Sequence, residues 1–92
     1  MQNTNHSTLI DVRTKEEFDS GSFPGAIHVP LNQVSLRIEE IKKMKFPIIL
    51  YCRSGNRSGQ AITILKKAGI HDALNGGGLE DMFKKLHYDK NN

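Results

Sequence analysis

Cysteine is almost absent from this chain. Cys52 is the only one among 92 residues, so neither a disulfide nor a cysteine-based metal site can form within one chain. The four histidines, at positions 6, 28, 71 and 87, stand apart from one another and from the cysteine, so we expect no metal and no cofactor. His28 falls in a segment expected to be a strand, and we interpret it as a packing or edge residue.

Long hydrophobic runs are absent as well. No apolar run approaches the ~18 residues of a membrane span, and the opening segment MQNTNHSTL has neither the basic nor the apolar part of a secretory leader. We therefore expect no membrane association and a cytoplasmic protein. The periplasm stays open, because a leader that had been removed would leave no trace.

Aromatic residues are sparse. There is no tryptophan, and the four phenylalanines and two tyrosines do not interleave with the basic residues, so the pattern does not favour a nucleic-acid partner. The net charge is +3, and most lysines fall in helical segments, which is typical of solvated helix faces. This balance suits a small anionic substrate better than a nucleic acid.

The chain is long enough for a single domain over residues 1–92. We expect an ordered core at about 8–87, polar and mobile ends at 1–7 and 88–92, and a monomer. Apolar strand-like runs alternate with helical patterns: strands at 8–12, 26–30, 47–51 and 72–75, and helices at 14–19, from 32 onward, at 57–68 and at 79–86. This alternation predicts an α/β fold with a parallel sheet and helices on both faces.

The stretch YCRSGNRSG, at 51–59, places the lone thiol between a strand and a helix. The first backbone N–H groups of that helix have no partner within the helix, and they carry the positive end of its dipole. Gly55 and Asn56 tolerate positive φ, so the loop can turn its N–H groups inward into an anion cradle. Arg53 and Arg57 add positive charge. The pattern predicts that Cys52 loses its proton below the free-thiol value of ~8.5 and acts as a nucleophile.

Two blander interpretations compete with this one. A cysteine at the end of a core strand can be a small apolar filler, although two arginines, a glycine and an asparagine within five positions favour the reactive interpretation. Asp11 and Arg13 lie at the end of the first expected strand. We interpret them as an ion pair or a cap that fixes that strand end.

Four separated motifs carry a family resemblance: LIDVR with the EEF helix (9–18), FPGAIHVPL (23–31), IILYCRSGNRS (48–58) and LNGGGLEDM (74–82). In this order and spacing they resemble the rhodanese sulfurtransferase domain, in particular the short single-domain bacterial rhodaneses of the phage-shock type. The resemblance implies a rhodanese-like parallel sheet of four to five strands, ordered fourth, third, first, second along this chain. We expect the strand that is usual ahead of LIDVR to be missing.

The resemblance also implies a thiosulfate sulfurtransferase. Cys52 would accept a sulfane sulfur from thiosulfate or a similar donor, forming a persulfide, and would pass it to cyanide, a thiol or a protein acceptor. The substrate-binding residues would be those of the loop, whose amides hold the persulfide: Arg53, Ser54, Gly55, Asn56, Arg57 and Ser58. Arg53 and Arg57 would also steer the anionic donor.

The sequence departs from the family pattern in two places, and two other functions stay open. Residues 22–26 read SFPGA where HIPGA is common, and Met82 stands where an aromatic is common; both changes bear on cleft shape. A cysteine-dependent phosphatase or arsenate reductase has five residues between cysteine and arginine. Here only four separate Cys52 from Arg57, a shorter cradle. A sulfur carrier or regulatory module that uses the same cleft without rapid turnover is the other alternative.

Overall fold

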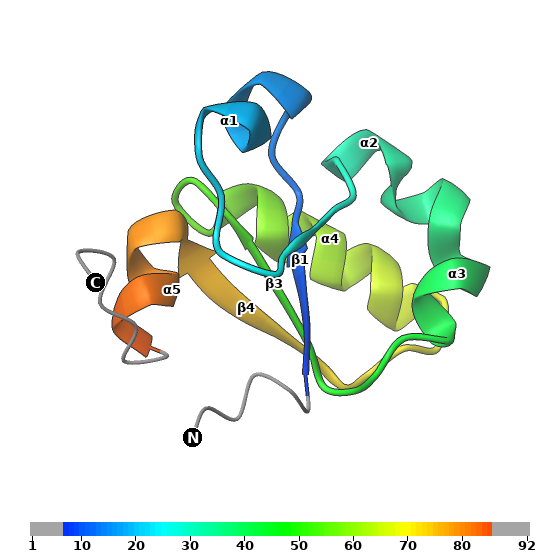
Figure 1. The fold of residues 1–92 in the computed structure, drawn as a ribbon. Helices are drawn as coiled ribbons and strands as arrows, with labels where there is room; N and C mark the ends of the chain where they lie inside the picture. The colour runs from blue at the N-terminus through cyan, green and yellow to red at the C-terminus, as the bar shows by residue number, and fades with distance from the viewer. Residues whose placement is uncertain (1–6, 86–92) are drawn as a thin grey trace.

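The computed structural model describes residues 7–85, which form a four-stranded parallel sheet covered by helices (Figure 1). The strands are β1 (Thr8–Asp11), β2 (Ile27–His28), β3 (Ile48–Cys52) and β4 (Ala73–Gly78). They are ordered β2-β1-β3-β4, and each neighbouring pair is parallel. The α/β fold, the parallel sheet and the strand order predicted from the sequence are therefore confirmed.

Of the four to five strands expected, the described residues contain four. A strand ahead of β1 would have to lie within residues 1–6, which fall outside the described part of the chain, as do residues 86–92. The predictions for the two polar ends, and for residues 86 and 87 of the expected core, fall largely on these segments.

The helices are α1 (Lys15–Ser20), α2 (Leu31–Val34), α3 (Ile38–Lys42), α4 (Asn56–Lys67) and α5 (Leu79–Lys85), with a short 3₁₀ turn, η2 (Ser35–Arg37), between α2 and α3. The capping box predicted at the start of α1 is present: the Thr14 side chain accepts from the Glu17 amide, and the Glu17 carboxylate accepts from the Thr14 amide. Figure 1 shows α1 beyond one end of the strands, while α4 runs alongside the sheet.

Alternation along the strands divides the core between the two faces of the sheet, because successive side chains of a strand point to opposite faces. One buried cluster joins Ile10, Leu50 and Cys52 of the strands to Ile41 of α3 and Leu65 of α4. It places the sulfur of Cys52 on the face that α4 covers.

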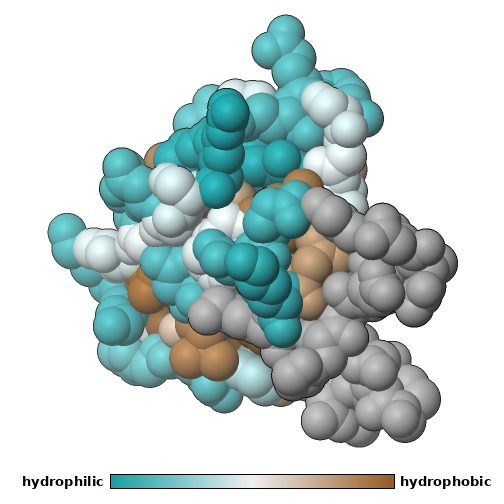
Figure 2. Space-filling model, turned by 90° about the vertical axis from the view of Figure 1, so that its left-hand side faces the viewer, coloured by the Kyte–Doolittle hydropathy of each residue, from teal (hydrophilic) through white to brown (hydrophobic). Residues whose placement is uncertain are grey.

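A second buried cluster occupies the other face. Leu9 and Tyr51, the strand neighbours of residues in the first cluster, pack there with Phe23 and with Met82 of α5. Helices on both faces are therefore confirmed. On the side of the molecule that carries α5, hydrophilic side chains cover much of the coloured surface, with smaller hydrophobic areas between them (Figure 2).

Several predicted boundaries were wrong. The second strand has two residues instead of five and ends ahead of Pro30, which has no N–H to donate to a ladder and is the N-cap of α2. The expected helix from 32 starts at Leu31 and is broken by η2. The glycines that were expected to follow the fourth strand belong to β4, where a register irregularity opposite Leu50 and Tyr51 accommodates the glycine run.

A membrane-spanning helix is not found among residues 7–85, since none of their helices combines the length and the apolar character that a span needs.

Candidate functional site

Cys52 is the last residue of β3, because the strand ends one residue later than the position 51 predicted from the sequence. Three residues, Arg53 to Gly55, turn the chain into α4, which begins at Asn56. Arg57 and Ser58 thus lie in the first turn of the helix, and all six residues predicted to form the cradle follow the sulfur directly. The thiol is 1% exposed and belongs to the core cluster on the α4 side, so the filler interpretation is correct about its burial.

The amides that follow the buried thiol turn toward it. Gly55 has φ of 100°, a conformation open to glycine, and its N–H donates to Cys52 Sγ at 3.0 Å. The hydroxyl of Ser58 lies 3.6 Å from the same sulfur.

These contacts determine the direction in which the pKa of Cys52 is shifted. Burial acts to raise the pKa of Cys52. The backbone N–H and hydroxyl of Ser58 and the backbone N–H groups of Ser54 and Gly55 act against it, and the net result is a pKa below that of an ordinary thiol. The cradle predicted from the loop sequence thus acts mainly through backbone donors and Ser58.

Asn75 of β4 holds the turn in place, a role that the sequence analysis missed. Its Nδ2 donates to the Gly55 carbonyl at 2.9 Å, while its Oδ1 accepts from the Ser58 hydroxyl at 2.7 Å and from the Gly77 N–H at 2.9 Å. The side chain ties the turn after Cys52, the first turn of α4 and the glycine run together. The only signal for it in the sequence is its place at the head of the NGGG motif.

The glycine run is required by close packing against the turn. A Cβ on Gly78 would collide with the carbonyl group of Arg53, and a Cβ on Gly76 would collide with the sulfur of Met82. The Gly78 N–H donates to Asp81 Oδ2 at 2.8 Å, which anchors the start of α5. Side chains at these positions would push β4 away from the turn that shapes the thiol's surroundings.

Asp11 and Arg13 form the ion pair that was expected to fix the end of β1. The two Asp11 oxygens accept from Arg13 Nε and Nη2 at 2.7 to 3.0 Å, and the Arg13 guanidinium also donates to the Gly21 carbonyl. Both side chains are buried, at 0% and 8% exposure. The pair is part of the framework, and its charge is internally balanced.

Arg57 is engaged in a second pair that the sequence analysis did not anticipate. Its Nη1 and Nη2 donate to the two carboxylate oxygens of Glu17 at 2.7 and 3.0 Å. These side chains keep 30% and 26% exposure. The hydrogen bonds from Arg57, then the one from the Thr14 amide, lower the pKa of Glu17 to about 2. Arg53, in contrast, is exposed and makes no side-chain ion pair or hydrogen bond within residues 7–85.

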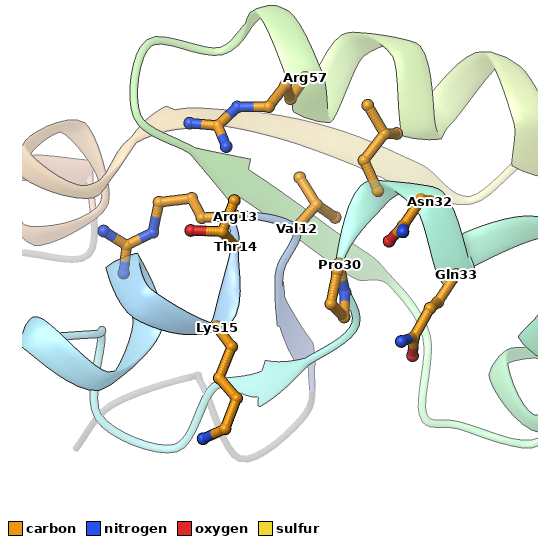
Figure 3. Close-up of a pocket in the computed structure, with 9 residues that line it drawn as sticks. Val12, Arg13, Thr14, Lys15, Pro30, Asn32, Gln33 and Arg57 are labelled. Atoms are coloured by element: carbon orange, nitrogen blue, oxygen red, sulfur yellow. The ribbon is translucent and has the colours of Figure 1, made fainter.

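Two hollows open on either side of this pair. The first, of about 630 Å³, is lined by Arg57 of α4, by the segment that follows β1 and by the start of α2 (Figure 3). In Figure 3, Val12 lies between Arg13, Thr14 and Lys15 on one side and Pro30, Asn32 and Gln33 on the other. The second hollow has a volume of about 420 Å³. It is lined by Arg53 and Glu17, by Arg13 after β1, by Ser20 and Gly21 at the end of α1, and by Leu79 and Glu80 at the start of α5.

Of the other predicted residues, Ser54 and Asn56 are exposed, and neither side chain makes a hydrogen bond or ion pair within the described range. His28, expected to be a packing or edge residue, stacks on Phe18 with 4.6 Å between ring centroids, and its Nε2 lies 2.8 Å from the Arg13 carbonyl. The arrangement as a whole can hold a thiolate beside backbone donors, and Arg53, the residue after Cys52, lines the second hollow.

Comparison with known proteins places this geometry in a family. A model described as a Rhodanese-like domain matches residues 1–84. The protein YqhL of Bacillus subtilis, described as uncharacterized, is 43% identical over 77 residues, which make up 84% of this chain and 58% of YqhL. Thiosulfate sulfurtransferase PspE of Escherichia coli is 39% identical over 74 residues, or 79% of this chain and 71% of PspE.

A solved structure described as a rhodanese with anions, from E. coli, superposes with a TM-score of 0.74 at 37% identity. The match covers 82% of this chain and 89% of that one.

Proposed function

The chain belongs to the family of rhodanese-like domains, and from this premise we propose that it is a thiosulfate sulfurtransferase that works through a persulfide on Cys52. A single domain carries out both half-reactions. Its partners are a small anionic sulfur donor and a thiol, cyanide or protein acceptor.

In the first half-reaction the Cys52 thiolate attacks the sulfane sulfur of thiosulfate. A new S–S bond forms, the bond to the sulfonate sulfur breaks, and sulfite leaves with the bonding electrons. In the second, the acceptor's thiolate or cyanide attacks the outer sulfur, and the Cys52 thiolate leaves. Each step exchanges one anion for another, so neither requires a metal or an outside oxidant.

The observation that carries the proposal is the convergence of backbone donors on a buried sulfur. The Gly55 N–H is already 3.0 Å from Sγ, and these donors keep the pKa of Cys52 below its ordinary value despite burial. A persulfide keeps its negative charge within the same turn, so the amides from Arg53 to Ser58 are suited to stabilise it. Arg53 supplies positive charge for the approaching donor, and Arg57 stands nearby with its charge paired to Glu17.

Intact mass spectrometry after incubation with thiosulfate tests the proposal. We expect one added sulfur atom on the wild-type chain, its removal by cyanide with release of thiocyanate, and no addition to the Cys52→Ser variant. Serine is nearly isosteric, so this variant should keep the wild-type circular dichroism spectrum. Sulfur transfer by folded Cys52→Ser would disprove the assignment, and phosphate release from an aryl phosphate would favour the phosphatase alternative.

A sulfur carrier is the second candidate, and the burial of the thiol bears on it. At 1% exposure, Cys52 has little open path to an acceptor of any size in this conformation, and slow release of the sulfur is what distinguishes a carrier. A carrier forms one equivalent of persulfide but transfers the outer sulfur to cyanide slowly. Comparing the rate of persulfide formation with the rate of thiocyanate release in a single turnover distinguishes the two.

A further inference from the structure

We propose that Glu17 is a specificity-determining residue: its carboxylate masks the charge of Arg57, so that the site favours sulfur donors of low negative charge over multiply charged ones. The inference rests on the proposed function, in which Cys52 is the nucleophile. It concerns how much of the Arg57 charge the donor meets.

Glu17 and Arg57 form a bidentate pair, and Arg57 is close to Cys52 in the sequence. Arg57 stands in the first turn of α4, five positions after Cys52, and the two groups interact electrostatically. Both terminal nitrogens of its guanidinium are bonded to the Glu17 carboxylate, at 2.7 and 3.0 Å. This is the bidentate arrangement in which an arginine would bind an oxyanion, so Glu17 occupies the donors that a substrate anion would use.

Glu17 is itself held in place. Its Oε1 accepts from the Thr14 amide at 2.9 Å and contacts the Thr14 hydroxyl at 3.2 Å, as part of the cap of α1. The carboxylate is fixed from two sides, by the helix cap and by an arginine 40 residues away in sequence. It therefore stays opposite Arg57 without help from a ligand.

Most of the described cations that line the two hollows are neutralised by a carboxylate. Arg13 is paired with Asp11, and Lys15 is paired with Asp19 at 2.8 Å. Among the described arginines and lysines that line the two hollows, Arg53 alone has no carboxylate partner. Thiosulfate brings two negative charges toward a thiolate, and it meets one uncompensated cation.

The pair also lies beside both hollows. Arg57 lines the first hollow and Glu17 lines the second, so the pair stands between them. Cys52 itself lines neither hollow, while Arg53, the next residue along the chain, lines the second. The sign and size of the charge at the pair bear on which anions approach this end of the sheet.

Glu17→Gln isolates this effect. Glutamine can still accept from the Thr14 amide, so the helix cap is kept while the negative charge is removed. The matched control is Glu16→Gln, which changes the neighbouring, exposed residue of the same helix turn and has no contact with Arg57. Both variants change the net charge of the protein by the same amount.

The measurement is alkylation of Cys52, the chain's only thiol, by iodoacetate and by neutral iodoacetamide at one pH. The ratio of the two rates cancels the thiolate fraction and reports how well an anion reaches the sulfur. We expect Glu17→Gln to raise the ratio roughly threefold to tenfold, as one unmasked charge at close range would. Glu16→Gln should change it less than about twofold, and added salt should reduce the gain.

Two further results complete the test. In the double variant Glu17→Gln/Arg57→Gln, where a neutral pair replaces a neutral pair, the ratio should return to about the wild-type value. The rate of persulfide formation from thiosulfate should rise by more than the iodoacetate ratio in Glu17→Gln, since thiosulfate carries two charges.

An unchanged ratio in Glu17→Gln, or a gain that persists in the double variant, would overturn the inference. The alkylation ratio does not depend on sulfur transfer. If the ratio behaves as expected while no variant forms a persulfide, the proposed function fails and the charge masking stands. If persulfide forms and the ratio does not move, only the masking fails.

Discussion

Two arginine–carboxylate pairs flank the carboxyl edge of the sheet, and their hydrogen bonds have nearly the same lengths. In Asp11–Arg13 both side chains are almost fully buried, whereas in Glu17–Arg57 about a quarter to a third of each is exposed. A buried pair cannot lose one partner without leaving a charge away from water, whereas an exposed pair can be hydrated. The same chemistry therefore serves the framework in one pair and can be adjusted in the other.

Asp11→Asn should separate the two pairs most clearly. Removing the Asp11 charge leaves the Arg13 guanidinium buried without compensation, which costs about 3–5 kcal/mol of unfolding free energy. Urea unfolding of wild type and variant measures the loss. The control is Asp19→Asn, which removes the same group from the exposed pair with Lys15 and should cost less than about 1 kcal/mol. Equal losses would show that burial does not distinguish these pairs.

Asn75→Ala tests whether the thiolate depends on an ordered turn. The variant loses the contacts to Gly55, Ser58 and Gly77, and we expect a loss of about 1–2 kcal/mol in stability. With its donors less ordered, the pKa of Cys52 should rise toward the free-thiol value. The pH midpoint of iodoacetamide alkylation reports this.

The control for that experiment is Gln60→Ala, which removes an exposed amide side chain from α4. Its alkylation midpoint should match that of the wild type. A midpoint in Asn75→Ala that equals the wild-type value, in a folded protein, would mean that the turn keeps its donors aligned without Asn75.

The Glu17–Arg57 pair should have the smallest effect on stability. Glu17→Gln is expected to cost about 0.2–1 kcal/mol at neutral pH, the range of partly exposed pairs. Because the folded-state pKa of Glu17 is lowered to about 2, its contribution is complete above the unfolded value near 4.5 and is lost as the pH falls toward 2.

Unfolding free energies of wild type and Glu17→Gln, measured between pH 7 and pH 2, test this sign. The difference between the two proteins should shrink as the solution is acidified. A difference that grew on acidification would contradict the lowered pKa.

Much of the fold follows from short-range patterns. The alternation of apolar runs with helical periods predicted the parallel sheet and its covering helices, and Thr14 with Glu17 predicted the cap of α1. Boundaries were predicted less well. β2 is shorter than its apolar run, and the glycine run, which packs closely against the turn after Cys52, belongs to β4.

The candidate site divides in the same way. The cradle was predictable because its donors lie within six residues of the sulfur, where helix geometry dictates their direction. The roles of Asn75 and of Glu17 toward the loop were not, since these residues lie 20 and 40 positions from the groups they bind. No periodicity in a sequence reports which side chains meet across such distances.

The order of residues around Cys52 was enough to specify a strand, a turn of backbone donors and a helix start, because those features depend on neighbours along the chain. Which positive charges near the sulfur remain available was decided when the fold brought Glu17 of α1 within hydrogen-bonding distance of Arg57 of α4. Charge compensation depends on distance in space, and only the folded chain sets that distance.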